Sequence, residues 1–467
     1  MKGNKKICLM LVFLLLAPTA LSACAQQSTA AVNAASNADE NIINEESMFS
    51  TIKELSSEKY EGRLVGTKEN EMAAQYIADQ FKALGLENPK GIDNYLQNYN
   101  TQVLAIKEEP ILQLEDSKGN VVKSFKYSED FLFRALSSSS EIDIKAPVFE
   151  LGSIEEMSTR MDSLKGKVAL FPISVNHSTT TAELIKYFMG AGALAGIGEF
   201  DTRSEERKYS RLTATPMRGI WMMGKYDPYL IVNNDTFSDI SNAAERNLIL
   251  HIKCDFSQDF QKQVPNVVGT ITGSDPELKN EYIIIGAHFD HVGDNKNGTY
   301  NPGALDNASG TAVLLEVARI IKSSDTVPKK SIIFAAFNGE ESGMTGSQAY
   351  VSDPPYPLDK SVMLCLDMVG CSAEIPLTIA TDESGAGKLA KELSKYAEEL
   401  KINYTKSTLS GSDHSSFSQA GVDSVLLINE DWLNGYHSPE DTMEDVSKSN
   451  IEQAAKLVLK YIDNNAY

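Results

Sequence analysis

The chain has 467 residues, of which 42% are hydrophobic and 23% charged, an ordinary globular composition long enough for two or three domains. Its net charge of −21 argues against a surface that attracts nucleic acid or an anionic membrane, so we expect neither as a partner.

The N-terminus has the features of an export signal. Three lysines within the first six residues precede an apolar stretch, Ile7 to Leu16, which is too short for a folded transmembrane span. The string Leu21-Ser22-Ala23-Cys24 resembles the bacterial lipobox. Cleavage after residues 1–23 would leave Cys24 lipidated, and the protein would be extracytoplasmic and touch the cell membrane only through this anchor. The alternative is an ordinary signal peptide with a chance cysteine.

The next segments differ sharply in composition. Residues 24–45 are rich in Ala, Ser, Asn and Gln, so we expect a flexible tether that cannot bury enough apolar surface to fold. Residues 46–130 are expected to begin the catalytic domain. Within them, apolar residues recur at helical spacing from Met72 to Phe81, which predicts an amphipathic helix.

Residues 131–256 are expected to form an inserted, β-rich small domain. Short β-rich runs such as Lys167 to Phe171 mix there with a Gly/Ala-rich segment from Gly190 to Gly198. No lysine or serine follows these glycines in the register of a phosphate-binding loop, so we expect an Ala/Gly helix packed closely on a sheet.

Residues 257–467 alternate short apolar runs with helical patterns. Continuous apolar strands of this kind occur in parallel sheets that are covered on both faces. The prediction is an α/β, three-layer αβα sandwich with a mixed, mostly parallel sheet. Its expected strands are Tyr282–Gly286, Ser331–Phe337, Val362–Leu366 and Ser424–Ile428. Expected helices include Thr311 to Ile321, capped by Ser309, and a last helix opened by a capping box of Ser449 and Glu452.

Residues able to bind a metal follow each predicted strand. In an open α/β sheet, ligands bind outside the carboxyl ends of the strands, so these side chains should meet in one place. Taken singly, each has a structural explanation as a surface histidine, a helix cap, a turn residue or a solvated acid. Their convergence favours a metal site made of His288, Asp306, Glu341, Asp367 and His437, with Glu340 beside it.

The strings AHFDHVG, GALDNASG, NGEESGMTGS, LDMVG and YHSPEDT resemble the motifs of the di-zinc aminopeptidase family, metallopeptidase family twenty-eight. This family also contains glutamate carboxypeptidase, glutaminyl cyclase and the transferrin receptor. The string LSSEKYEGRLVGT at residues 55–67 is similar to the N-terminal stretch of its bacterial members. The insert resembles the protease-associated domain that many members carry.

The resemblance implies two zinc ions per chain. His288 and Asp367 would hold one zinc ion, Glu341 and His437 the other, and Asp306 would bridge them. Imidazole and carboxylate suit zinc, and each ion would keep an open position. Glu340 would then act as general base on a bridging zinc hydroxide.

Two further residues near the metal ligands are expected to assist the reaction. Asp290 is expected to hydrogen-bond the other ring nitrogen of His288, and Tyr436 resembles a tyrosine that donates to the tetrahedral oxyanion. His291 and His414 are left without an assigned role. Many relatives have asparagine at the position of Cys365, which puts the support of Asp367 in doubt.

The function implied is an extracytoplasmic metallopeptidase acting on peptides or proteins, and we expect an aminopeptidase. The alternatives are a carboxypeptidase or glutaminyl cyclase on the same fold, or an inactive receptor-like binding protein. Cys254, Cys365 and Cys371 are expected to be buried free thiols, although a bridge between the last two is an alternative.

Overall fold

The computed structural model describes residues 43–467, except 136–140, 177–180, 201–227, 244, 383–386 and 433–434. The predicted export signal, Cys24 and nearly all of the predicted tether lie outside the described residues. Within the described part of the chain, no helix has both the length and the apolar character needed to cross a bilayer.

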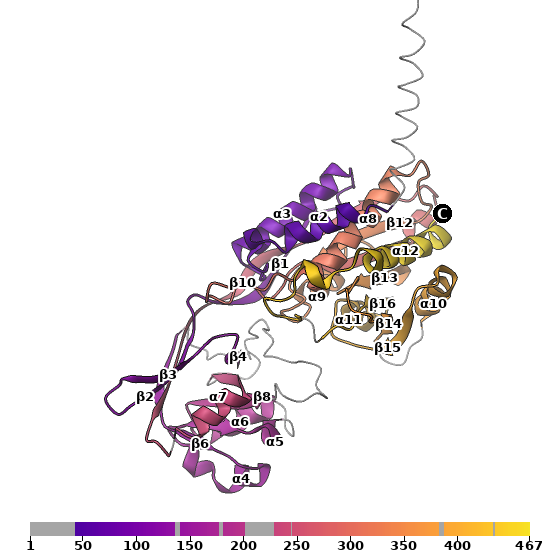
Figure 1. The fold of residues 1–467 in the computed structure, drawn as a ribbon. Helices are drawn as coiled ribbons and strands as arrows, with labels where there is room; N and C mark the ends of the chain where they lie inside the picture. The colour runs from indigo at the N-terminus through magenta and orange to yellow at the C-terminus, as the bar shows by residue number, and fades with distance from the viewer. Residues whose placement is uncertain are drawn as a thin grey trace, which may run out of the picture. The chain divides into compact units, whose positions relative to one another are not determined.

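The large sheet has a parallel centre, as the apolar runs predict. The strand order through this part of the sheet is β15-β14-β16-β13-β11-β12-β10 (Figure 1). Neighbouring strands from β16 to β12 run parallel, whereas β14 and β10 pair antiparallel with β16 and β12. The strands are β10 (Ile249–Ile271), β11 (Tyr282–His288), β12 (Ser331–Phe337), β13 (Ser361–Leu366), β14 (Leu377–Thr381), β15 (Tyr404–Thr408) and β16 (Asp423–Ile428).

Helices cover both faces of this sheet. Every residue of β11 and β12 is buried, which requires packing against both faces because successive side chains point to opposite sides. The α/β sandwich expected from the sequence is therefore present. The helices are α2 (Glu45–Leu55), α3 (Lys68–Ala83), α8 (Gly310–Ser323), α9 (Thr345–Ser352), α10 (Lys388–Leu400), α11 (His414–Gln419) and α12 (Lys448–Asn465).

Two helix starts differ in detail from the expected caps. Helix α12 begins two residues earlier, because the Ser447 hydroxyl, and not that of Ser449, accepts the Asn450 amide at 3.4 Å. At α8, Ser309 occupies the cap position, but its hydroxyl donates to the Leu305 carbonyl at 2.6 Å.

A second hydrophobic core lies in the middle of the chain. It is built on a five-stranded sheet of order β4-β9-β8-β7-β6, together with strands β2, β3 and β5 on the long strand β10. Leu104, Leu112 and Leu114 belong to this core, so it begins earlier along the chain than residue 131. The strands are β1 (Leu96–Ile106, paired with β10), β2 (Ile111–Glu115), β3 (Val121–Phe125), β4 (Phe131–Ala135), β5 (Glu141–Ala146), β6 (Val148–Glu150), β7 (Val168–Phe171), β8 (Ala195–Phe200) and β9 (Tyr229–Asn233). Its helices are α4 (Ile154–Thr159), α5 (Ile173–Asn176), α6 (Thr181–Gly190) and α7 (Asn234–Ser241).

The Gly/Ala-rich segment is not a helix, and that prediction is wrong. Gly190 ends helix α6, and Ala195–Phe200 forms strand β8. A Cβ on Gly196 would lie 2.4 Å from the Phe188 ring, and one on Gly198 would lie 2.1 Å from the Tyr229 hydroxyl. These glycines therefore let aromatic rings pack directly on the strand.

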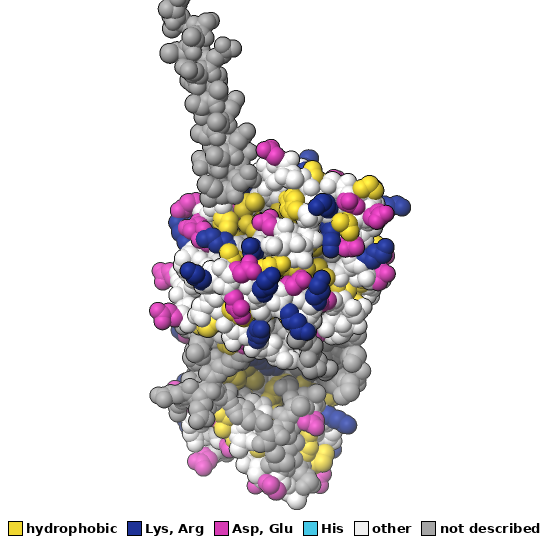
Figure 2. All heavy atoms as spheres, turned by 90° about the vertical axis from the view of Figure 1, so that its right-hand side faces the viewer, with side chains coloured by type: hydrophobic (Ala, Val, Ile, Leu, Met, Phe, Trp, Pro, Cys, Tyr) yellow, Lys and Arg dark blue, Asp and Glu magenta, His cyan; other side chains and the backbone are white. Residues whose placement is uncertain are grey.

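On the face shown in Figure 2, basic and acidic side chains are interspersed and neither sign forms a separate patch.

Cys254, Cys365 and Cys371 are buried free thiols, so the alternative of a bridge between the last two does not hold.

Candidate metal centre

The predicted metal-binding side chains follow the carboxyl ends of the parallel strands. His288 is the last residue of β11, Glu340 and Glu341 lie in the turn after β12, and Asp367 follows β13. Asp306 lies in the turn of residues Ala304–Ser309 that leads into α8. The sheet thus collects residues that are far apart in sequence at one edge.

The first group of donor atoms consists of His288, Asp306 and Asp367, all buried. His288 Nε2 lies 3.1 Å from Asp367 Oδ1 and 3.4 Å from Asp306 Oδ1. Two carboxylate oxygens and one imidazole nitrogen therefore face one another within a small space.

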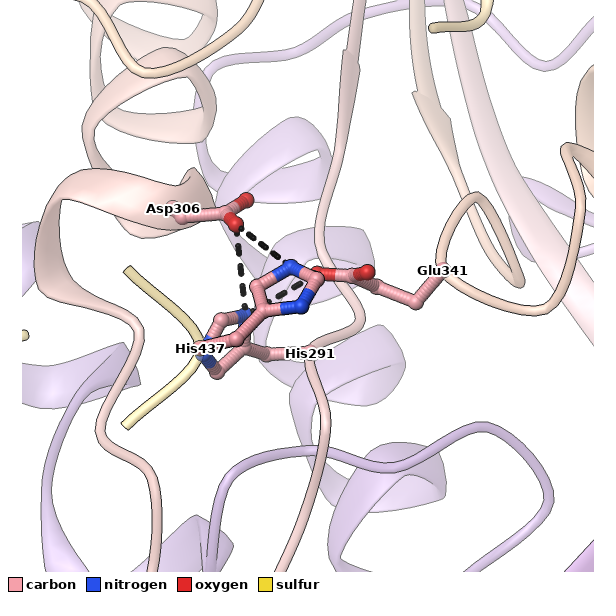
Figure 3. A group of neighbouring side chains, drawn as sticks. All are labelled: His291, Asp306, Glu341 and His437. Carbon is pink, nitrogen blue, oxygen red and sulfur yellow. Dashed lines mark hydrogen bonds and ion pairs between the residues drawn. The ribbon is translucent and has the colours of Figure 1, made fainter. Parts of the chain in front are cut away.

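The second group consists of His291, Asp306, Glu341 and His437, also buried (Figure 3). His437 Nε2 lies 3.1 Å from Asp306 Oδ2 and 3.0 Å from Glu341 Oε1. Asp306 thus offers one oxygen to each group, as a bridging carboxylate would. His291, whose role the sequence left open, brings Nδ1 to 3.1 Å from Glu341 Oε1.

The spacing of these donors suits zinc. An ion bonded to nitrogen and oxygen at about 2.0–2.2 Å in tetrahedral geometry holds its donors about 3.3–3.6 Å apart. The measured donor pairs in the two groups lie between 3.0 and 3.8 Å. Imidazole and carboxylate donors are also those that zinc prefers.

The backbone and carboxylate of Asp290 support both sides of the site. The ring nitrogen Nδ1 of His288 donates to the Asp290 backbone carbonyl at 3.2 Å, whereas the nearer carboxylate oxygen is 3.8 Å away. The Asp290 carboxylate instead accepts the backbone amides of Glu340 at 3.1 Å and Glu341 at 3.3 Å. Asp290 therefore fixes the turn that carries both glutamates, which differs from the role expected for its carboxylate.

Asp367 is supported in spite of Cys365. The Ser412 hydroxyl donates to Asp367 Oδ2 at 2.7 Å, which leaves Oδ1 facing His288. Cys365 Sγ lies 3.6 Å from the same hydroxyl. The hydrogen bond that orients Asp367 thus comes from the loop before α11, a source that the sequence did not indicate.

Two further residues complete the surroundings. Asp441, which is buried, accepts the backbone amides of Leu305 at 2.7 Å and Asp306 at 3.0 Å, so it holds the turn that carries Asp306. His414 donates from Nε2 to the Leu409 carbonyl at 2.9 Å and lies outside both donor groups.

A cavity of about 240 Å³ opens above the donor groups. Glu340 is half-buried and lines it, and the ring of Tyr436 lies parallel to that of His437 with centroids 3.8 Å apart. The rest of the wall is mainly apolar, and no Lys or Arg occurs among its described residues. Its apolar members are Met368, Leu409, Leu426, Ile428, Trp432 and Tyr436.

Burial and like charges perturb the acids and bases of the site. Burial, with Glu341, Asp367 and Asp413 nearby, raises the pKa of Glu340 well above its ordinary value, although His288 opposes this shift. Burial also raises the pKa of Asp290 to about 7. Burial disfavours the charged form of His437, but Glu341 and Asp306 outweigh it and raise its pKa to about 10. A bound dication would stabilise the ionised carboxylates, so this cluster of acids is the environment expected of a metal centre.

Comparison with known proteins gives consistent matches over most of the chain. Residues 266–462 match the family described as peptidase family M28. Aminopeptidase YwaD of Bacillus subtilis (strain 168) is 30% identical over 426 residues, which cover 88% of this chain and 82% of that protein.

Solved structures share the fold. BSAP, a zinc aminopeptidase from Bacillus subtilis, has a TM-score of 0.70 at 23% identity over 91% of this chain and 96% of its own. The aminopeptidase from Aneurinibacillus sp. strain AM-1 has a TM-score of 0.66 at 22% identity over 91% of this chain and 94% of its own.

Proposed function

The chain belongs to peptidase family M28 and is a zinc-dependent peptidase, and on that premise we propose that it removes N-terminal residues from peptides with Glu340 as general base. The observation that carries this proposal is the pair of buried donor groups that share Asp306 beneath a cavity lined by Glu340.

Two zinc ions per chain are part of the proposal. His288, Asp306 and Asp367 would hold one, and Asp306, Glu341 and His437 would hold the other. Bound there, zinc would polarise the scissile carbonyl and lower the pKa of the attacking water. The donor spacing and the two separately used oxygens of Asp306 support this count.

Glu340 would move the proton. It lines the cavity beside its neighbour Glu341 but belongs to neither donor group, so its carboxylate is free to take a proton from water and give it to the leaving amine. The hydrogen bonds that the backbone amides of this turn donate to Asp290 would keep the Glu340 carboxylate in place.

Tyr436 would donate a hydrogen bond to the developing oxyanion. Its position in the cavity wall, stacked on His437, supports this role. A Tyr436→Phe variant should lower kcat and leave KM nearly unchanged. An unchanged kcat would exclude the role.

The charges of the cavity favour an aminopeptidase over a carboxypeptidase. The described lining contains no Lys or Arg, so it offers no basic side chain to a C-terminal carboxylate, and two zinc ions would balance the charge of its four carboxylates. The apolar wall suits a large apolar side chain on the first residue.

The experiment is hydrolysis of a panel of aminoacyl-p-nitroanilides by the soluble form that begins at Ala25. It is run on the protein as purified, after chelation and after zinc is restored, and the metal content is measured on the same samples. We expect activity that disappears and returns with about two ions per chain. Two bound ions with no activity on this panel, but with release of the C-terminal residue from N-blocked peptides, would instead establish a carboxypeptidase.

We also propose that Cys24 carries a lipid and that the enzyme works outside the cell membrane. The string Leu21-Ser22-Ala23-Cys24 and the polar tether after it support this location. In a bacterial host, a Cys24→Ser variant should lose acyl labelling and leave the membrane fraction. Persistent acylation of the variant would exclude this anchor.

The second core is proposed to be a protease-associated domain that shapes access to the site. The Lys107 amide donates to the Asp255 carbonyl at 3.0 Å, so deletion of residues 108–254 and closure by an Asn-Gly turn leaves the ladder between β1 and β10 intact. This deletion should change the ratio of activities on long peptides and aminoacyl-p-nitroanilides. An unchanged ratio would count against the role.

A further inference from the structure

The two donor groups differ in the number of donors that they contain. The group around Glu341 contains a fourth buried donor, His291, whereas the group around Asp367 has three. His291 comes three residues after His288, which ends β11, so the end of this strand and the loop after it supply one imidazole to each group.

The four donors of the second group lie within 4.8 Å of one another, and four of the distances between them suit zinc ligands. Besides the two distances from His437, His291 Nδ1 lies 3.1 Å from Glu341 Oε1 and 3.8 Å from Asp306 Oδ2. These distances bracket the edge of about 3.3–3.6 Å for a zinc tetrahedron, and Figure 3 shows the two rings converging with the two carboxylates. His291 Nδ1 is therefore close enough to the other three donors to share a zinc ion with them.

We propose that His291 is a fourth protein ligand of the second zinc ion, so that the two ions differ in the number of their protein ligands. This inference rests on the proposed function, because it concerns how the same metal centre is divided. Four protein ligands are typical of structural zinc sites, and three with an open position are typical of catalytic sites.

The packing of His291 supports a role at Nδ1. The side chain is fully buried, and its Nε2 has no hydrogen-bond partner among the described residues. A Cβ on Gly303 would lie 2.6 Å from its ring, and the ring meets that of His437 edge to face at 5.4 Å. Burial of a ring with one unpaired nitrogen costs free energy, so a strong interaction at the other nitrogen has to stabilise it.

The alternative is that His291 only donates a hydrogen bond to Glu341. Loss of such an outer hydrogen bond typically weakens metal binding 10–100-fold. His291→Asn separates the two roles, because the asparagine amide keeps a donor near the position of Nδ1 but is a poor zinc ligand. His291→Asp keeps a zinc ligand and removes the donor.

The test measures zinc per chain over a series of buffered free-zinc concentrations, for the parent and both variants. We expect two binding steps in the parent, the tighter one weakened more than 100-fold in His291→Asn and partly restored in His291→Asp. His251→Asn is the matched control, since His251 is a buried histidine whose ring nitrogens contact Glu115 and Asp143 in the second core. It should bind zinc like the parent.

Cobalt substitution gives a second readout that needs no variant. The NMR spectrum of the di-cobalt parent should show three strongly shifted, exchangeable imidazole N–H signals, one each from His288, His291 and His437. Only two signals, or equal zinc affinities in the parent and His291→Asn, would overturn the inference while the proposed function stands. A parent that binds no zinc would overturn both.

Discussion

The guanidinium of Arg63 donates a hydrogen bond from Nε to the backbone carbonyl of Phe289 at 2.7 Å, directly between His288 and Asp290. The same fully buried side chain donates to the carbonyls of Pro302 at 2.7 Å and Gly303 at 3.0 Å, just before the turn that carries Asp306. A single cation thus connects the two segments that carry the proposed metal ligands His288 and Asp306.

Arg63→Met should therefore loosen the metal centre as well as the fold. Its loss leaves buried carbonyls without donors, which we expect to cost about 3–5 kcal/mol of unfolding free energy. Chemical denaturation and zinc affinity would be measured together. Arg160→Met is the control, because Arg160 makes a partly exposed ion pair with Glu156 and a cation–π contact with the Phe149 ring, and its loss should cost about 1 kcal/mol. If Arg63→Met kept the parent's zinc affinity, the loops would not depend on this cation.

Glu340→Gln should separate catalysis from metal binding. The substitution preserves shape and removes the proton acceptor, so kcat should fall by about 10²–10⁴, while metal content stays at the parent's level. Asp306→Asn is the informative contrast, since it alters the residue shared by both donor groups and should lose metal as well as activity. Near-parental turnover in Glu340→Gln would assign the proton transfer to another group.

The strands of the large sheet could be predicted from sequence because buried parallel strands need continuous apolar runs, and β11 and β12 have them. The structure of the Gly190–Gly198 segment could not be predicted in this way. Gly196 and Gly198 make room for the side chains of Phe188 and Tyr229, and no local sequence pattern reveals these contacts. The start of α12 was predicted two residues too late, because Ser447 and Ser449 are both residues of a type that caps helices and the structure uses Ser447.

The proposed metal ligands could be named from their places at strand ends, but two features of the site could not. Arg63 lies in a loop without periodicity, and only its position in the string EGRLVGT could have marked it. His291 was visible in AHFDHVG, yet its side chain joins Glu341 only through the tertiary arrangement of the loops after β11 and β12. Contacts between distant loops are not encoded in spacing along either one.

Gly196→Ala should destabilise the second core. The new methyl group would lie 2.4 Å from a ring carbon of Phe188, well inside contact distance in a buried strand, and overpacking of this kind costs about 1–3 kcal/mol. Gly190→Ala is the matched control, because the nearest atom to its Cβ is Met161 Cε at 3.8 Å. Limited proteolysis and thermal unfolding of both variants would test the difference; equal stability would mean that the Phe188 ring moves aside without cost.

Glu115 makes the stability of the second core depend on acid pH. Hydrogen bonds from Lys145 and Gln113 lower the pKa of this buried carboxyl from its ordinary value of 4.5 to about 2. Because the folded-state pKa is depressed, the contribution is complete above pH 4.5 and is lost as the pH falls through about 2.

Glu115→Gln should therefore destabilise the protein by about 1–2 kcal/mol at pH 6, a value reduced by solvent screening of the half-exposed Lys145, and progressively less toward pH 2. The measurement is the difference in unfolding free energy between variant and parent at each pH. Loss of metal at acid pH destabilises both proteins equally, so it does not contribute to this difference. Glu129→Gln, at an exposed pair with Lys126, should show no difference at any pH. A Glu115→Gln difference that stayed constant down to pH 2 would mean that the side chain contributes through packing and not through its charge.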